Sequence, residues 1–253
     1  MNLEKLRWQV KRIISDLLAG EFSFLRGKSL LSDTAILRHM EAGNIVIDVF
    51  DARNLGTCSY DVTLGEWYWR EHNPDGGVMT YNPWSEKDVR RVWGAKPFVA
   101  EPARIWMDEH GPLENIHPDD QIIWIAPGET ILCHTNEFIG GRGGIITTMM
   151  KARSTLGRNF IEVCKCAGWG DVGYVNRWTM EFTNNSRFYQ IPLVVGRRVA
   201  QIAFFEVEKI RSAQYEKDGK YQDTDDLEEI KKKWNPTAML PKMFKDREIR
   251  RAA

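Results

Sequence analysis

The chain has 253 residues, of which 43% are hydrophobic, so it can bury a sizeable core and global disorder is excluded. Its 35 basic and 35 acidic residues cancel, which argues against a protein that coats a nucleic-acid polymer or binds a membrane surface by charge. This balance still allows a local basic pocket for a phosphorylated small molecule.

The N-terminal segment is predicted to be helical. Apolar residues recur at helical spacing over residues 3–18, which indicates an amphipathic helix that packs on the body of the protein or on a neighbouring subunit. Charges scattered through this segment argue against a secretory signal, and no apolar run reaches the roughly 18 residues that span a bilayer. Four cysteines in the whole chain are typical of reduced thiols, so we expect a cytoplasmic protein.

The rest of the chain is predominantly β in character. A helix is expected from the cap Ser32 to Gly43, followed by a strand at 45–49. From Ser59 onwards, short apolar segments separated by Gly, Pro and Asn predict strands. These segments are SYDVTLG (59–65), IIWIAPGETILCHT (122–135), GIITTMM (144–150), and FYQIPLVVG and RRVAQIAFFEVE around a turn at Gly196. The expected fold class is an all-β barrel or sandwich.

Two segments depart from this pattern. Residues 66–120 hold six of the ten prolines and five of the ten tryptophans, which predicts a long irregular excursion with its own aromatic mini-core. Residues 224–234 (TDDLEEIKKKW) predict a short helix whose acidic start and basic end suit the helix dipole.

Several familiar site motifs are absent or weak. The chain has no GxxxxGK[ST] phosphate loop, no HExxH and no GxSxG elbow. His39 and Glu41 match half of a zinc deaminase motif, but the P-C-x-x-C half is missing. Cys164 and Cys166 are better interpreted as two half-buried strand thiols than as zinc ligands. The GGRGG segment (140–144) favours a hairpin turn over a phosphate loop, because no helix follows it.

Glu181 is the residue that the pattern does not explain. It stands among apolar residues of a predicted strand, where a buried carboxylate costs several kcal/mol unless it is paired or protonated. Upstream, Arg153-Ser154-Thr155 and Arg158 are groups suited to a triphosphate. Asp171 precedes Glu181 by ten residues, so on a regular strand both would face the same side. The alternative is an exposed ion-pair network on a sheet.

The spacing of these residues resembles a known family, the dCTP deaminase branch of the dUTPase superfamily. The segments that carry the resemblance are residues 31–51, SYDVTLG, RSTLGR (153–158), AGWGDVGY (167–174), Glu181-Phe182, GRRVAQIAF (196–204) and GKYQ (219–222). In the family pattern a plain dUTPase has an apolar residue at the position of Glu181 and no arginine at that of Arg158. The AGW-x-D-x-GY form is also similar to bifunctional members, which convert dCTP to dUMP.

The resemblance implies a distorted jelly-roll β barrel that forms a homotrimer with active sites between subunits. Glu181 would be the general base, Ser154 and the Ala167 carbonyl would hold the attacking water, and Arg158 would stabilise charge beside Glu181. Asp171 would contact the deoxyribose. The other implied substrate-binding residues are Arg153, Thr155, Thr179, Met180, Gln201, Tyr215, Lys220 and Tyr221. Mg²⁺ would bridge the phosphates without a protein side chain, and no zinc would be needed.

The resemblance also divides the chain. Residues 1–30 would form a helical extension, residues 31–210 the β domain with its insertion at about 66–120, and residues 211–253 a C-terminal lid and tail. After GKYQ the family continues to a second Gln and a Gly-Pro, whereas here Asp223-Thr224-Asp225-Asp226 precedes the predicted helix. The lid therefore departs from the family pattern.

The expected reaction is deamination of dCTP, or of a 5-modified dCTP, to dUTP and ammonia. Three alternatives remain open. The first is a bifunctional enzyme that gives dUMP. The second is a diphosphohydrolase for dUTP or another dNTP, with Asp171 activating water. The third is a catalytically silent nucleotide-binding regulator.

Overall fold

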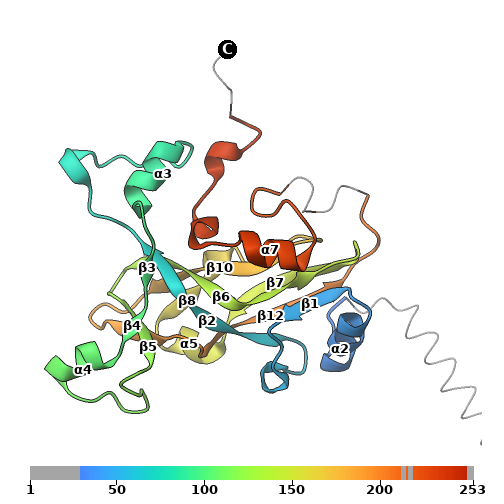
Figure 1. Ribbon diagram of the computed structural model, residues 1–253, viewed down its shortest axis with the longest axis horizontal. Helices are drawn as coiled ribbons and strands as arrows, with labels where there is room; N and C mark the ends of the chain where they lie inside the picture. Colours follow the sequence, from blue (N-terminus) through green and yellow to red (C-terminus); the bar gives the residue numbers. More distant parts are fainter. Residues whose placement is uncertain (1–28, 212–214, 216–218, 250–253) are drawn as a thin grey trace, which may run out of the picture.

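A computed structural model describes residues 29–211, 215 and 219–249 of the chain (Figure 1). The amphipathic helix expected at 3–18 lies outside these residues. Within them, no helix is long and apolar enough to cross a membrane.

Two predicted helices are confirmed. Helix α2 (Asp33–Glu41) begins after Ser32, whose hydroxyl accepts a hydrogen bond from the Ala35 backbone N–H. Helix α7 (Leu227–Lys233) begins after the cap Asp226, whose side chain accepts two backbone N–H bonds. Its acidic first turn and its lysine-rich last turn suit the helix dipole, as expected.

The body of the protein is a curled antiparallel sheet of nine strands (Figure 1). The order is β8-β10-β6-β2-β12-β7-β9, with β1 added on β6 and β3 on β2. The strands are β1 (Ile45–Asp48), β2 (Tyr60–Arg70), β3 (Phe98–Val99), β6 (Thr130–Gly141), β7 (Ile146–Ala152), β8 (Ile161–Val163), β9 (Trp169–Gly170), β10 (Val175–Asn184) and β12 (Arg198–Glu206). This half-barrel confirms the predicted β class.

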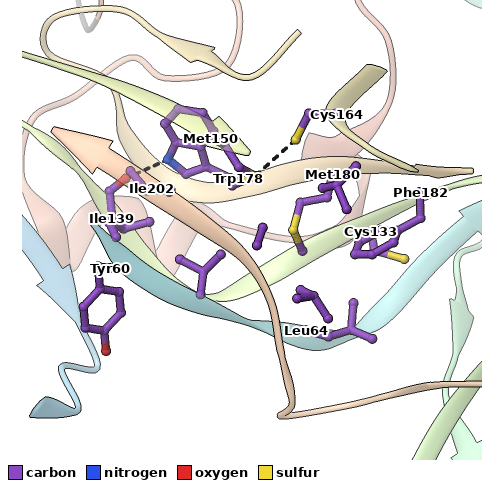
Figure 2. Packing of buried hydrophobic residues seen from close by; sticks show 14 of the residues in the cluster. Tyr60, Leu64, Cys133, Ile139, Met150, Cys164, Trp178, Met180, Phe182 and Ile202 are labelled. Carbon is purple, nitrogen blue, oxygen red and sulfur yellow. Dashed lines mark hydrogen bonds between the residues drawn. The ribbon is translucent and has the colours of Figure 1, made fainter. Parts of the chain in front are cut away.

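Strand β10 shows how the sheet separates core from surface. Trp178, Met180 and Phe182 are buried and point into the main core, where Figure 2 shows them against side chains of neighbouring strands. The Trp178 indole N–H donates to the Ile139 carbonyl at 2.9 Å. Because successive strand residues face opposite sides, Glu181 must face away from this core.

The segment expected to be irregular is more ordered than predicted. Strand β2 continues into it as far as Arg70, and the rest contains α3 (Glu86–Trp93) and α4 (Arg104–His110). Strand β3 returns to pair with β2, and β4 (Glu101–Pro102) joins β5 (Gln121–Ile125) and β11 (Ile191–Val194) in a small second sheet. The sequence did not reveal these short elements because their partners are distant in the chain.

The expected aromatic mini-core exists, but the C-terminal tail supplies part of it. Trp69 and Leu132 from the sheet pack with Met239 and Leu240 from the tail, and Trp93 of α3 lies against them. The Trp69 indole N–H donates to the Pro236 carbonyl at 2.8 Å. The tail therefore packs on the sheet face opposite the main core.

Two smaller predictions were wrong. Cys164 and Cys166 lie in a 3-10 turn and not on a strand; Cys164 is buried, with its thiol 3.1 Å from the Met150 sulfur (Figure 2), and Cys166 is exposed. The GGRGG segment does contain a turn, at 143–145, but this turn is not a hairpin, because β6 and β7 pair with different neighbours.

Candidate active site

Glu181 lies on the outer face of β10. Its position in the ladder is opposite Leu132 of β6, and it alternates with the buried Met180 and Phe182. The side chain is half-buried, on the sheet face that the tail and α3 cover. Its burial therefore comes from segments far away in the sequence.

A pocket of about 490 Å³ opens beside Glu181. Six of the predicted site residues line it: Ala167, Asp171, Thr179, Glu181, Tyr215 and Tyr221. The turn before Ala167, the turn that contains Asp171 and the segment near residue 221 thus meet at the outer face of β10. The volume is in the range of pockets that bind small molecules.

The AGWGD turn reaches this pocket through close backbone packing. The Gly168 carbonyl accepts a bond from the Met150 N–H at 2.6 Å, and a Cβ at Gly168 would lie 2.3 Å from the Met150 carbonyl oxygen. A Cβ at Gly170 would lie 2.4 Å from the Trp178 ring. Only glycine fits at these two positions.

Asp171 reaches the pocket by a route that the sequence did not predict. It lies in the turn after β9, before β10 begins, so it does not share a regular strand with Glu181. The strand itself carries a register shift between Arg177 and Thr179. The two carboxylates line one pocket because the turn folds back. They do not do so as residues on the same side of one regular strand, which the sequence predicted.

A run of unusual backbone places a cation in the same pocket. Cys164, Lys165 and Cys166 have positive φ values of 68°, 40° and 66°, which non-glycine residues rarely adopt. Lys165 lines the pocket, and so does Ala167, which follows Cys166. Such strain is often found at functional sites, which makes this turn a candidate part of the machinery.

The electrostatics of the pocket favour proton transfer. Burial raises the pKa of the Glu181 carboxyl, and the nearby Lys165 ammonium partly opposes that rise. Burial also raises the pKa of Tyr215 to about 12 and raises that of Tyr221. Both phenols are therefore protonated hydrogen-bond donors at neutral pH, next to a carboxyl group that holds its proton more readily than usual.

The RSTLGR residues do not line this pocket. Arg153 precedes α5 (Ser154–Arg158) and forms an ion pair with Asp61, Nε to Oδ2, at 3.2 Å. Arg198 contacts the same oxygen at 3.1 Å, so Arg153 takes part in an ion-pair network whose carboxylate is Asp61 and neither Asp171 nor Glu181. Ser154, Thr155 and Arg158 are exposed.

Three more predicted residues lie elsewhere. Gln201 on β12 is half-buried and lies opposite Asp61 of β2, close to the Arg153 ion pair. Met180 is fully buried in the main core, so its side chain faces away from Glu181. Lys220 lines a different cavity and pairs with Asp246.

Sequence reasoning missed several lining residues. Lys165 lies between the two cysteines that drew attention as thiols, and Trp93 belongs to the tryptophan-rich insertion. Met239 and Pro241 come from the tail. The density of tryptophans was a signal for Trp93, but no local pattern indicated that the tail would reach the pocket.

The described residues offer no ready-made site for a metal ion. Among the described residues, no group of three or more His, Cys, Asp or Glu side chains is arranged to hold a metal ion. His39 is buried beside Asn44, with its Nδ1 atom 3.3 Å from the amide nitrogen, and does not approach the cysteine turn.

A half-buried carboxylate, neutral phenols and a tight glycine turn in one pocket are typical of a small-molecule enzyme site. The sequence pattern of the dCTP deaminase-like family matches residues 30–207, which is more than half of the chain. The chain therefore belongs to the dCTP deaminase-like family.

Two curated relatives agree with this assignment. The chain is 30% identical over 196 residues to a "dCTP deaminase, dUMP-forming" of Persephonella marina, covering 76% of this chain and 91% of that protein. It is 28% identical over 183 residues to a protein of the same name from Methanococcus vannielii, covering 69% and 80%. A solved structure of a 2'-deoxycytidine 5'-triphosphate deaminase from Agrobacterium tumefaciens has 17% identity and a TM-score of 0.49, covering 72% of this chain and 49% of that one.

Proposed function

We propose that the protein deaminates dCTP and then hydrolyses the dUTP to dUMP. The first step consumes water and releases ammonia, and the second consumes water and releases pyrophosphate. The proposal is supported by the family match and by relatives whose names specify dUMP as the product. Analysis of the sequence alone gave dUTP as the main product and dUMP as the alternative, and these relatives favour the alternative.

The observation that carries the proposal is the half-buried Glu181 carboxylate with a raised pKa in a small-molecule pocket. As general base it takes a proton from water, whose oxygen attacks C4 of the cytosine ring. It then returns a proton to the leaving nitrogen, so that ammonia departs. A carboxylate with a raised pKa can both accept and donate a proton near neutral pH.

The other pocket residues have roles that their chemistry supports. The Ala167 carbonyl accepts a hydrogen bond from the attacking water, and Asp171 accepts one from the deoxyribose. Tyr215 and Tyr221 donate from neutral phenols to acceptors on the nucleotide. Thr179 precedes Glu181 by two residues on β10 and lines the same pocket, so it can contact the base.

The site needs further groups for the triphosphate, and we infer that a neighbouring subunit supplies them. Ser154, Thr155 and Arg158 are exposed on one chain and lie outside the lining of the Glu181 pocket. Trp169, which lines the pocket, is 57% exposed, and Phe188 and Tyr189, which pack edge to face on each other after β10, are 79% and 69% exposed. These surfaces suit a homotrimer in which each site lies between two chains.

Magnesium fits this arrangement as part of the substrate. The described residues provide no carboxylate or imidazole cluster for a resident metal, so Mg²⁺ would be held by phosphate oxygens. When bound there, Mg²⁺ neutralises phosphate charge and favours cleavage at phosphorus.

One assay tests the proposal. The protein is incubated with dCTP and Mg²⁺, and ammonia, dUTP, dUMP and pyrophosphate are followed over time. We expect ammonia and dUMP to rise in equal amounts. Accumulation of dUTP would show a deaminase alone, pyrophosphate without ammonia would show a diphosphohydrolase, and no product would indicate a silent nucleotide-binding protein.

A further inference from the structure

A second cavity, of about 650 Å³, lies between α3, residues 219–224, α7 and the tail. Its wall carries five cationic side chains and two carboxylates. The cations are Arg90, Lys220, Lys233, Lys242 and Lys245, and the carboxylates are Glu86 and Asp223. The wall therefore carries more cationic than anionic side chains in a chain whose net charge is zero.

The carboxylates neutralise only some of these cations. Arg90 pairs with Glu86 at 2.9 Å, and Lys233 pairs with Glu229 at 2.8 Å and with Asp223 at 3.2 Å. Lys220 pairs with Asp246. In the part of the chain that the structure describes, the two remaining lysines of the cavity, 242 and 245, form no ion pair.

Lys242 is held in place although no carboxylate binds it. Its Nζ donates to the Lys220 carbonyl at 3.0 Å and lies 4.6 Å from the centre of the Tyr221 ring. Its backbone N–H donates to the Tyr221 hydroxyl at 3.2 Å, which fixes the tail against the GKYQ segment. Burial and the charge of Lys245 lower the pKa of Lys242, and the nearby Asp223 carboxylate partly opposes this shift. Two like charges held close together in a cavity cost free energy that a bound anion would offset.

We propose that this cavity binds an oligophosphate anion, with Lys242 and Lys245 as its main binding residues. An extended polyanion suits a wall with several cations better than a compact monovalent ion does, because several phosphates can each meet an ammonium group. Both lysines lie beyond residue 207, where the family match ends. The family match therefore assigns no role to these two lysines.

The anion can come from two sources. Tyr221 and Pro241 line both this cavity and the Glu181 pocket, so the two cavities adjoin. One source is the triphosphate of a nucleotide whose base lies beside Glu181, and this source rests on the proposed function. The other is a separate nucleoside triphosphate or free oligophosphate, and anion binding itself does not depend on the proposed function.

The binding test uses inorganic tripolyphosphate and isothermal titration calorimetry on the full chain. We expect Lys242→Met and Lys245→Met to weaken binding by about tenfold to a hundredfold each, the usual range for a hydrogen bond to a charged group. Lys242→Arg should retain most of the affinity. Lys232→Met, which removes the same charge from an exposed position of α7 outside the cavity, should bind like the wild type.

The outcomes are separable. Equal affinity in the wild type, Lys242→Met and Lys245→Met, or no binding to the wild type, would overturn the proposal. Repeating the titration on Glu181→Gln saturated with dCTP distinguishes the sources. Loss of tripolyphosphate binding assigns the cavity to the substrate triphosphate, and persistent binding that still depends on Lys242 assigns it to a separate ligand. If dCTP neither binds nor reacts, the proposed function fails while the tripolyphosphate result stands.

Discussion

At the scale of the residue, the half-buried Glu181 carboxylate is the general base of the proposed reaction. Glu181→Gln keeps the shape of the side chain but removes the basic oxygen. Loss of a positioned general base usually lowers the rate by about 10²–10⁴. We therefore expect the rate of ammonia release from dCTP to fall by that factor, while the Kd for dCTP measured by calorimetry changes little.

The control for this variant is Glu162→Gln, which makes the same chemical change on β8, outside the pocket lining. It should deaminate dCTP at the wild-type rate. Near-normal ammonia release by Glu181→Gln would show that another group is the base.

The same residue should affect stability in a pH-dependent way. Because the folded-state pKa of Glu181 is raised above its ordinary value of 4.5, the folded chain binds more protons than the unfolded chain between these two pKa values. Stability then falls as pH rises through this interval, and the penalty persists above it. We expect Glu181→Gln to have a higher Tm than the wild type at pH 7, with a difference that shrinks below pH 4.5. A difference that is independent of pH would contradict the raised pKa.

At the scale of the element, the tail is part of the folded body. Leu240 is 7% exposed and packs with Trp69 and Leu132 of the sheet. A Leu→Ala change at a buried site costs about 2–5 kcal/mol. We expect Leu240→Ala to lower the free energy of unfolding in urea by that amount.

The matched control is Leu37→Ala on α2, where the side chain is 40% exposed, and its effect should be much smaller. Equal stability of the two variants would show that the tail does not pack as described. For the same reason, deletion of the tail would expose Trp69, so point substitutions in the tail test its role in binding more cleanly than truncation does.

At the scale of the whole molecule, the proposed trimer makes a specific prediction about mixed subunits. Glu181→Gln and Arg158→Ala should each be inactive, because each lacks one half of every site. If the halves come from different chains, random mixing of the two variants restores about one quarter of the sites. The measurement is ammonia release after the mixture is refolded together.

The control is the same mixture without refolding, in which the original assemblies persist and activity should be absent. If the refolded mixture also stays inactive, while light scattering shows mixed assemblies, then Glu181 and Arg158 act within one chain and the intersubunit site is wrong.

Local patterns in the sequence determined the class of the fold and the most informative residue. Strand alternation is a short-range property, so the β class could be predicted, as could the burial of residues 178, 180 and 182 around Glu181. The cap at Ser32 and the charged ends of α7 are likewise local signals. The ordered motifs at family spacing gave the family.

The tertiary structure alone decided which residues share a pocket. Trp93, Met239 and Pro241 meet Glu181 only because the insertion and the tail pack on the outer face of β10, and contacts between such distant segments leave no local pattern. Asp171 arrives through a turn, and Lys165 through left-handed backbone that its sequence does not signal. The cavity that Lys242 lines likewise depends on how the tail packs against GKYQ. Charges scattered along the sequence form a site only when folding brings them together.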